Sequence, residues 1–360
     1  MTRENEFSVA ASYFGYFRRD NNTTSSPTKG RDDSKASLSS LVDPAIPHKI
    51  WAEDNWTSTD EENAKQVLDN HIEKCSISAS LTRLQISQPD DEEEDANAWD
   101  QFYTNHGNRF FKDRHYFSTE FPEEFNNRPP AQHRSPNETK TLVEIGCGVG
   151  NALLPLLEVS EEHDNDDGNW DVVHGLDISK TAIDIMSQEL RFLAFNKMGP
   201  RKKVYGHVCD ISKTLSLPSI CSGVSNVTTL IFCLSAIDPQ YHADAAKNVI
   251  DTLRPGGILV FRDYGRYDEA QMKLGTSRSK RIKENFYRKH DGTKCFYFTS
   301  NDLEELFCTQ LGMNVIELKY LRRVYNNKAM SQARRRVWVQ GRFQKPFEEE
   351  KVCTNDIEIS

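Results

Sequence analysis

From Thr141 to Gly265, short apolar runs that read as strands alternate with segments of helical pattern. The strand-like runs are TLVEIG, WDVVHGLDIS, KVYGHVCDIS, VTTLIFCLSAID and ILVFRDYG. Strands that alternate with helices pair in parallel, because each helix carries the chain back to the same end of the sheet. Further on, MNVIELKYLRRV and RRRVWVQGRFQ read as two antiparallel strands. The order of these segments predicts a doubly wound α/β sheet that ends in an antiparallel hairpin.

The chain before residue 96 is mostly polar. Asn21 to Ser40 carries almost nothing apolar, which is typical of a flexible linker. The segment TSTDEENAKQVLDNHIEKC predicts a helix with Ser58 or Thr59 at the N-cap. The acidic run from Gln88 to Asp95 predicts a solvated linker. We therefore expect a partly disordered N-terminal extension that contains one helix.

The eight cysteines form no CxxC pair and no Cys/His cluster at zinc spacing. Several lie inside apolar runs, as in VCDI and IFCLSAI, so we expect buried free thiols in a reducing compartment and no bound metal. No apolar run approaches the roughly 20 residues that span a bilayer, and the N-terminus lacks a secretory apolar core. These features favour the cytoplasm, with the nucleus as a second location, and no membrane.

The formal net charge of −9 disfavours a nucleic-acid partner, but the basic residues are concentrated in two runs. From Lys273 to Lys289 there are seven Lys or Arg and one acid, and from Lys319 to Lys345 there are nine and no acid. Charge runs are usually solvated faces, yet two of them beside a ligand-binding fold favour contact with a phosphate backbone. The candidate contacts are Arg281, Lys283, Arg334, Arg335 and Arg336.

The first strand ends in the glycine-rich turn GCGVG. Gly146 and Gly148 allow the backbone to turn tightly and approach a ligand, which then faces the free N–H groups of the following helix. Glycines alone are weak evidence, but Glu144 precedes the turn, and Asp177 and Asp210 end the next two strands. The pattern is GxGxG, which differs from the dinucleotide fingerprint GxGxxG and from a P-loop.

These residues resemble motif I of the class I S-adenosylmethionine methyltransferases, E/D-x-G-x-G-x-G. The resemblance implies a Rossmann-like sheet of seven mostly parallel strands with an antiparallel C-terminal hairpin, and S-adenosylmethionine as the cofactor. Asp177 matches the residue that binds the ribose hydroxyls, and Asp210 the residue beside the adenine amino group. The other residues that the resemblance assigns to the cofactor are Glu144, Gly146, Gly148, Ile211 and Ile231.

A narrower resemblance rests on WDQFYTNHGNRFFKDRHYF, EIGCGVGN, LIFCLSAID, FRDYG and RRRVWVQGRF. Together these segments, from Trp99 to Phe343, are similar to the tRNA 3-methylcytidine methyltransferases. The family often has Trp where this chain has Tyr116. The segment around Trp51 and Trp56 resembles the subgroup that modifies threonine tRNAs. The resemblance implies methylation of N3 of a cytidine at position 32 of the tRNA anticodon loop.

The same resemblance implies a flap over the cofactor. Trp99 and Tyr103 stand on one face of a helix and would contact the cofactor, although aromatic stripes more often belong to a core. The following segment FFKDRHYF would link the flap to the active site, with its aromatics anchoring the flap or stacking on a base. Its basic residues Lys112, Arg114 and His115 would meet the RNA.

Methyl transfer to cytosine N3 needs no general base, because neutral N3 has a free lone pair. A nearby carboxylate would stabilise the positive charge that develops on the base. Asp263 in FRDYG is the first candidate, with Arg262 and Tyr264 positioning it or the nucleotide, and Asp238 is the second. The alternative is that Arg262 and Asp263 form a structural ion pair at the strand end.

We expect the chain to divide into four regions. Residues 1–95 form an N-terminal extension, a candidate tRNA-binding element, and residues 96–133 form the cofactor flap. Residues 134–346 form the methyltransferase domain, with a basic insertion at 266–300, and residues 347–360 form a tail. The partner implied is the anticodon stem-loop of tRNA, with an accessory protein as a further candidate. Two other functions stay open: a non-catalytic RNA-binding subunit of a methyltransferase complex, and a protein methyltransferase.

Overall fold

The computed structural model of the protein describes residues 51–53, 57–79, 92–125, 139–157, 170–200, 202–327 and 332–347. The predictions for Asn21 to Ser40, for Trp56 and for the start of the acidic run lie outside these residues, as does the tail 348–360. The side chains of Trp51 and Arg334 are outside the description as well.

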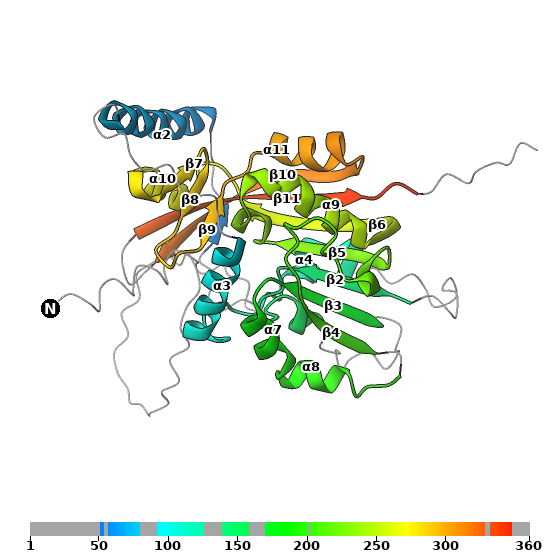
Figure 1. Ribbon diagram of the computed structural model, residues 1–360. Helices are drawn as coiled ribbons and strands as arrows, with labels where there is room; N and C mark the ends of the chain where they lie inside the picture. Colours follow the sequence, from blue (N-terminus) through cyan, green and yellow to red (C-terminus); the bar gives the residue numbers. More distant parts are fainter. Residues whose placement is uncertain are drawn as a thin grey trace, which may run out of the picture.

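Eight strands form one sheet in the order β1-β10-β11-β6-β5-β2-β3-β4 (Figure 1). Neighbours among β2 to β6 pair in parallel, whereas β11 runs antiparallel to β6 and β10. This arrangement confirms the predicted Rossmann-like sheet with its antiparallel C-terminal hairpin. The strands are β1 (Trp51–Glu53), β2 (Thr141–Ile145), β3 (Val172–Asp177), β4 (Lys203–Val208), β5 (Ser225–Ile231), β6 (Leu253–Tyr264), β10 (Asn314–Asn327) and β11 (Gln332–Gln344).

The short strand β1 was not predicted. It pairs antiparallel with β10 at the edge of the sheet, with Trp51 opposite Tyr325. Three residues are too few to give a strand signal in the sequence. The extension therefore joins the main sheet before the helix that follows it.

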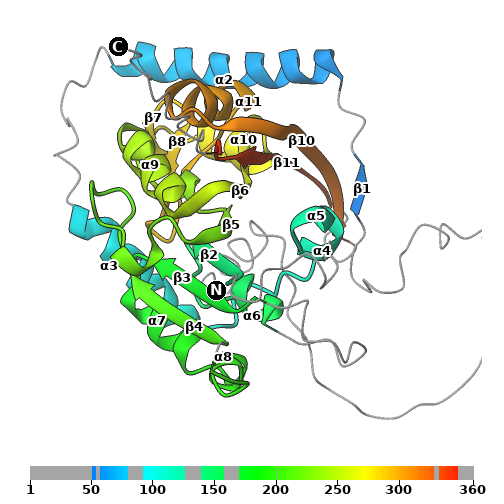
Figure 2. The same ribbon diagram turned by 90° about the vertical axis from the view of Figure 1, so that its right-hand side faces the viewer.

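Helices cover both faces of the sheet (Figure 2). All five residues of β2 are buried, which explains why this strand reads as a continuous apolar run. One face packs against α9, α11 and η8, and the other against α4, α6, α7 and α8. The helices are α3 (Glu92–His106), α4 (Phe117–Glu120), α5 (Pro122–Phe125), α6 (Leu153–Leu156), α7 (Lys180–Ser187), α8 (Leu190–Phe195), α9 (His242–Thr252) and α11 (Ser300–Glu304), with short turns η4 (Ser219–Cys221), η5 (Leu234–Ala236), η6 (Pro239–Tyr241) and η8 (Glu305–Gln310, a π-helix).

The predicted basic insertion folds as a small unit of its own. It contains α10 (Glu269–Gly275), η7 (Arg278–Lys280) and a three-stranded antiparallel sheet of β7 (Arg281–Lys283), β8 (Phe286–Arg288) and β9 (Lys294–Phe296). The long helix α2 (Ser58–Ala79) lies along α10 (Figures 1 and 2). Leu68 of α2 is buried there, at a point where a side chain on Gly275 would overlap it.

Two details of the N-terminal prediction were wrong. The N-cap of α2 is Thr57 rather than Ser58 or Thr59: the Thr57 hydroxyl accepts a hydrogen bond from Asp60 N (3.2 Å), and the Asp60 carboxylate accepts one from Thr57 N (2.9 Å). The end of the acidic run is not a solvated linker, because α3 begins at Glu92. Glu94 pairs with Arg288 (2.7 Å) and Asp95 with Lys294 (3.0 Å) of the basic insertion.

Within the described part of the chain, no helix is both long enough and apolar enough to cross a membrane.

Candidate active site

The glycine-rich turn sits at the carboxyl end of β2, where ligands bind in open α/β sheets. Gly146 and Gly148 both have positive φ values, +67° and +53°. A Cβ on Gly148 would overlap the hydroxyl oxygen of Tyr103, and one on Gly146 would overlap the thiol of Cys233. Glycine is therefore required at both positions by backbone conformation and by close neighbours.

Asp177 ends β3 directly beside this turn. Its carboxylate accepts hydrogen bonds from Gly148 N (2.8 Å) and Ser179 N (2.8 Å). Burial raises the pKa of Asp177 to about 6, although these two backbone donors oppose the shift. At neutral pH the group is a buried carboxylate next to the glycines, which suits a pair of vicinal hydroxyl donors.

Glu144 is the buried acid of the same strand end. Among the described residues its Oε2 atom has no hydrogen-bond partner, and the residue is 2% exposed. Burial raises the pKa of Glu144 to about 8, against the favourable charge of Arg114. A buried carboxyl oxygen without a partner is costly, so this atom is a candidate ligand contact.

Asp210 and Ile211 follow β4, on the next loop of the same sheet edge. One oxygen of Asp210 accepts from the backbone N (3.0 Å) and hydroxyl (2.6 Å) of Ser212, and the other lies 3.5 Å from Lys213 Nζ. Ile211 is buried in the core. Ile231, at the end of β5, is also buried, and its carbonyl accepts a 3.4 Å hydrogen bond from Arg114. The loop after β4 thus places one carboxylate and one apolar side chain at this edge.

The predicted flap is helix α3. Trp99 and Tyr103 share one face, with ring centroids 5.9 Å apart. Asp100 holds the helix in place: its Oδ1 atom accepts hydrogen bonds from the Ser179 hydroxyl (2.6 Å) and from Thr181 N (2.9 Å). Because Ser179 also binds Asp177, the flap and the β3 carboxylate are connected through one residue.

The segment FFKDRHYF packs inward for the most part. The rings of Phe110 and Phe111 lie 4.9 Å and 5.7 Å from that of Phe102 on α3, so these aromatics anchor the flap. Asp113 pairs with Arg191 (2.7 Å). Arg114 is half-buried near Glu144, with its guanidinium 5.2 Å from the Phe232 ring. Lys112 is half-buried, and His115 is exposed.

The end of β6 matches neither the predicted catalytic role of Asp263 nor the alternative, an ion pair between Arg262 and Asp263. Arg262 and Asp263 do not pair, because successive residues of a strand point to opposite faces. The Asp263 carboxylate is fully buried and accepts from Ser235 N (2.9 Å) and Tyr264 N (2.8 Å). Arg262 is 4% exposed, donates to Gln340 (2.9 Å) and pairs with Glu120 (3.1 Å).

This burial argues against the predicted direct catalytic roles of Arg262 and Asp263. Asp263 instead positions the loop after β5, through Ser235. Burial raises the pKa of Asp263 to about 6. The second candidate, Asp238, is 2% exposed and pairs with Lys283 (2.6 Å) of the basic insertion. Each carboxylate thus has a structural partner in this state.

Three aromatic rings form a corner beside these residues: Phe232, Tyr264 and Trp338. The Phe232 ring lies 5.0 Å from that of Tyr264 and 6.0 Å from that of Trp338. Phe232 has a φ of +54°, a strained conformation for a bulky side chain and one that is enriched at functional sites. This aromatic corner lies next to the cofactor turn in the fold, because β5 and β6 end at the same edge as β2. Sequence reasoning did not single out Phe232, whereas Trp338 belongs to the RRRVWVQGRF segment and is one of the aromatics interleaved with its basic run.

The residues present fit S-adenosylmethionine, the group that motif I implies. The glycine turn has no room for side chains, Asp177 offers acceptor oxygens, and Glu144 has a buried oxygen without a partner among the described residues. Tyr103 and Trp99 would close the site from α3. Asp210, Ile211 and Ile231 would face the nucleoside from the loops after β4 and β5.

The methyltransferase domain family matches residues 87–318 of the chain. A tRNA N(3)-cytidine methyltransferase METTL2 of Xenopus tropicalis is 31% identical over 86% of this chain and 94% of its own length. A tRNA N(3)-methylcytidine methyltransferase of Drosophila melanogaster is 35% identical over 74% of this chain and 77% of its own. The chain belongs to the tRNA N(3)-cytidine methyltransferase family. A crystal structure of an S-adenosylmethionine-dependent methyltransferase from Anabaena variabilis is 14% identical, has a TM-score of 0.47, and covers 73% of this chain and 100% of its own.

In this member of the tRNA N(3)-cytidine methyltransferase family, the candidate RNA contacts separate into two groups. Arg336 is 8% exposed and pairs with the fully buried Asp268 (2.7 Å), which argues against its predicted contact with RNA. Arg335 and Lys283 are about half exposed, and Arg281 is half-buried. Successive residues of β11 alternate between the interior and the surface, a distinction that a run of three arginines does not reveal.

Proposed function

We propose that the protein transfers a methyl group from S-adenosylmethionine to N3 of cytidine in tRNA, at position 32 of the anticodon loop of threonine tRNA. One observation carries the proposal: Asp177, the glycine turn and Tyr103 form a nucleoside site at the sheet edge where the aromatic corner also lies. Membership of a family whose named relatives act on cytidine N3 of tRNA supports the substrate. The choice of position 32 and of threonine tRNA rests on the likeness of the segment around Trp51 and Trp56.

When bound, S-adenosylmethionine supplies an electrophilic methyl group on a sulfonium centre. The protein's part is to bind, orient and shield. Asp177 holds the ribose hydroxyls, Trp99 and Tyr103 close over the nucleoside, and α3 excludes water from that side. No side chain needs to remove a proton from N3, because its lone pair is free in neutral cytosine.

The aromatic corner offers a platform for the flipped base. Base–aromatic stacking contributes about 1–3 kcal/mol per base. The methylated base is cationic if its amino group stays intact, and the faces of Phe232 and Tyr264 favour a cation.

RNA-backbone contacts come from the candidate basic side chains that are exposed or half-buried. We assign Arg281, Lys283 and Arg335 to this role, together with His115 and Lys112. Arg114 is placed to contact the base or the cofactor rather than phosphate, since it lies against Phe232 and Ile231.

The proposal also covers the location of the protein in the cell and an accessory protein. The six cysteines whose side chains the structure describes are free, which supports a reducing compartment: the cytoplasm, and also the nucleus. Imaging of the tagged full chain tests this location. An accessory protein stays a prediction, and the activity of the purified chain alone tests it.

The decisive experiment is to incubate the purified chain with S-adenosylmethionine and total tRNA from a strain that lacks it, and to quantify modified nucleosides by mass spectrometry. We expect 3-methylcytidine to rise with wild type and not with Asp177→Ala. Cofactor binding without any tRNA methylation would instead favour the RNA-binding subunit, and methylation of protein but not tRNA would favour a protein methyltransferase. Digestion of individually captured tRNAs then tests threonine tRNA and position 32.

A further inference from the structure

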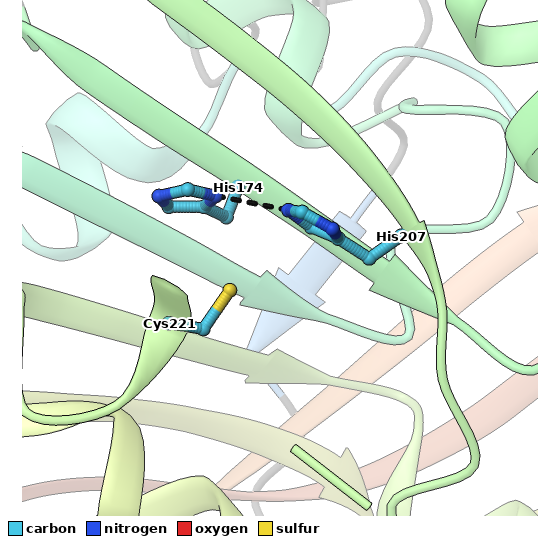
Figure 3. A group of neighbouring side chains, drawn as sticks. All are labelled: His174, His207 and Cys221. Atoms are coloured by element: carbon cyan, nitrogen blue, oxygen red, sulfur yellow. Dashed lines mark hydrogen bonds between the residues drawn. The ribbon is translucent and has the colours of Figure 1, made fainter. Parts of the chain in front are cut away.

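His174, His207 and Cys221 come together on the strands β3 and β4 and the turn η4 (Figure 3). One ligand atom from each lies within 4.8 Å of the others. Figure 3 shows the Cys221 sulfur directed toward the pair of imidazoles. Local sequence spacing did not reveal this group, because strand pairing rather than chain proximity creates it.

The two imidazoles face each other through nitrogen atoms. His174 Nδ1 lies 3.0 Å from His207 Nε2. Two histidine nitrogens bound to one tetrahedral ion at 2.0–2.1 Å are about 3.3 Å apart. The rings would therefore have to separate by only a few tenths of an ångström to bind one ion between them. Cys221 Sγ, which lies within 4.8 Å of both nitrogens, would have to approach by up to about 1 Å to serve as the third ligand.

Burial of these polar side chains without a ligand is energetically unfavourable. His174 is 1% exposed, and Cys221 is fully buried in the same apolar cluster as Leu176. Polar rings cost free energy when they leave water, and one hydrogen bond between two imidazoles offsets that cost only in part. A neutral imidazole offers a lone pair to a metal ion, so both rings are suited to ligation.

We propose that His174, His207 and Cys221 form a binding site for a zinc-like divalent ion. Two imidazoles and a thiolate are ligands that Zn²⁺ prefers and that Mg²⁺ and Ca²⁺ do not. Binding releases the Cys221 thiol proton to solvent, and the ion accepts the sulfur lone pair. His207 is only half-buried, so a water molecule can reach the fourth position from its side.

The site would join β3 to β4 three residues before the carboxylates that the nucleoside needs. His174 precedes Asp177 on β3, and His207 precedes Asp210 after β4. β4 is the edge strand, with only β3 as a neighbour in the sheet. A bound ion would therefore fix the edge strand and hold the two carboxylates at a constant separation. The role is positional and takes no part in methyl transfer.

The test uses the full-length chain, stripped of metal with a chelator and titrated with Co²⁺ and then Zn²⁺. We expect one equivalent bound per chain, a thiolate-to-cobalt charge-transfer band that Zn²⁺ abolishes, and a higher melting temperature with Zn²⁺. Cys221→Ser should lose the band, and His207→Asn should weaken binding by about 10–100-fold or more. Cys308→Ser, a partly exposed thiol on η8, is the matched control and should behave as wild type.

His207→Asn guards against a folding defect, because the side chain is half-buried. S-adenosylmethionine binding by each variant shows that it is folded. The proposal is overturned if wild type binds no stoichiometric ion, or if Cys221→Ser and His207→Asn bind Co²⁺ with the same spectrum and affinity as wild type. These readouts do not depend on methyltransferase activity.

Discussion

The carboxylate of Asp100 accepts a 2.6 Å hydrogen bond from the hydroxyl of Ser179. This bond joins the flap helix α3 to the start of α7, 79 residues later in the chain. The backbone N of Ser179 donates to Asp177 at the same time. The position of the flap and the orientation of the β3 carboxylate therefore depend on a shared contact.

Asp100→Ala should weaken the binding of S-adenosylmethionine without unfolding the protein. Loss of hydrogen bonds to a partly exposed carboxylate costs about 1–2 kcal/mol, or roughly a 5- to 30-fold rise in Kd. Isothermal titration calorimetry measures it. Gln101→Ala, one position along on the exposed face of α3, is the matched control. Equal Kd values for the two variants would contradict the proposed connection.

Gly148→Ala should displace Tyr103 and impair the cofactor site. The new Cβ overlaps the Tyr103 hydroxyl, and the φ of +53° is unfavourable for alanine by about 1–2 kcal/mol. Adding Tyr103→Phe removes the overlapping oxygen and leaves the ring carbon Cζ at 3.2 Å from the Cβ. We expect the double variant to recover part of the lost affinity for S-adenosylmethionine, a coupling that a double-mutant cycle measures. Strictly additive losses would show that the overlap is unimportant.

The buried Glu144 should make stability depend on pH. Its pKa is raised from 4.5 to about 8 in the folded state, so the folded protein keeps a proton that the unfolded chain loses above pH 4.5. The contribution of Glu144 to the free energy of unfolding is therefore at its maximum below pH 4.5 and decreases as the pH rises toward 8. At about 1.4 kcal/mol per pKa unit, the stability that this group can lose over the interval is at most roughly 5 kcal/mol.

Glu144→Gln should flatten this part of the pH profile, because glutamine stays neutral. Urea unfolding across the interval measures the difference between the variant and wild type. Glu304→Gln, at an exposed position of α11, serves as the control and should retain the wild-type slope. A wild-type slope in Glu144→Gln would show that another group causes the dependence.

Two adjacent arginines should respond in opposite ways to removal. Arg336→Ala leaves the fully buried Asp268 without its charged partner and with only the backbone N–H groups of Ala270 and Val337 as donors, which costs about 3–5 kcal/mol of stability. Arg335→Ala removes a half-exposed side chain and should leave the free energy of unfolding nearly unchanged. Its effect should appear as weaker tRNA binding with a smaller dependence on salt. Unfolding curves and binding at two salt concentrations separate the roles, and the reverse pattern would refute the assignment.

Much of the fold could be read from local patterns. The strand TLVEI is a continuous apolar run because both faces of β2 are buried, and GCGVG needs glycine because of its positive φ values. Prediction from the sequence failed for short elements that are stabilised by contacts with distant parts of the chain. β1 has three residues and exists through its pairing with β10, and the acids after Glu92 are helical where Arg288 and Lys294 meet them.

The sequence by itself determined the order of strands and helices, the cofactor turn and the acids at the strand ends, because periodicity and backbone conformation are local properties. The tertiary structure decided which of those groups are available. Asp263 and Arg262 were candidates for catalysis until their burial and their partners were known, and Arg335 and Arg336 were equivalent until β11 placed them on opposite sides. Strand register also brought His174, His207 and Cys221 together from separate elements. Contacts between residues far apart in the chain depend on packing, which no single segment encodes.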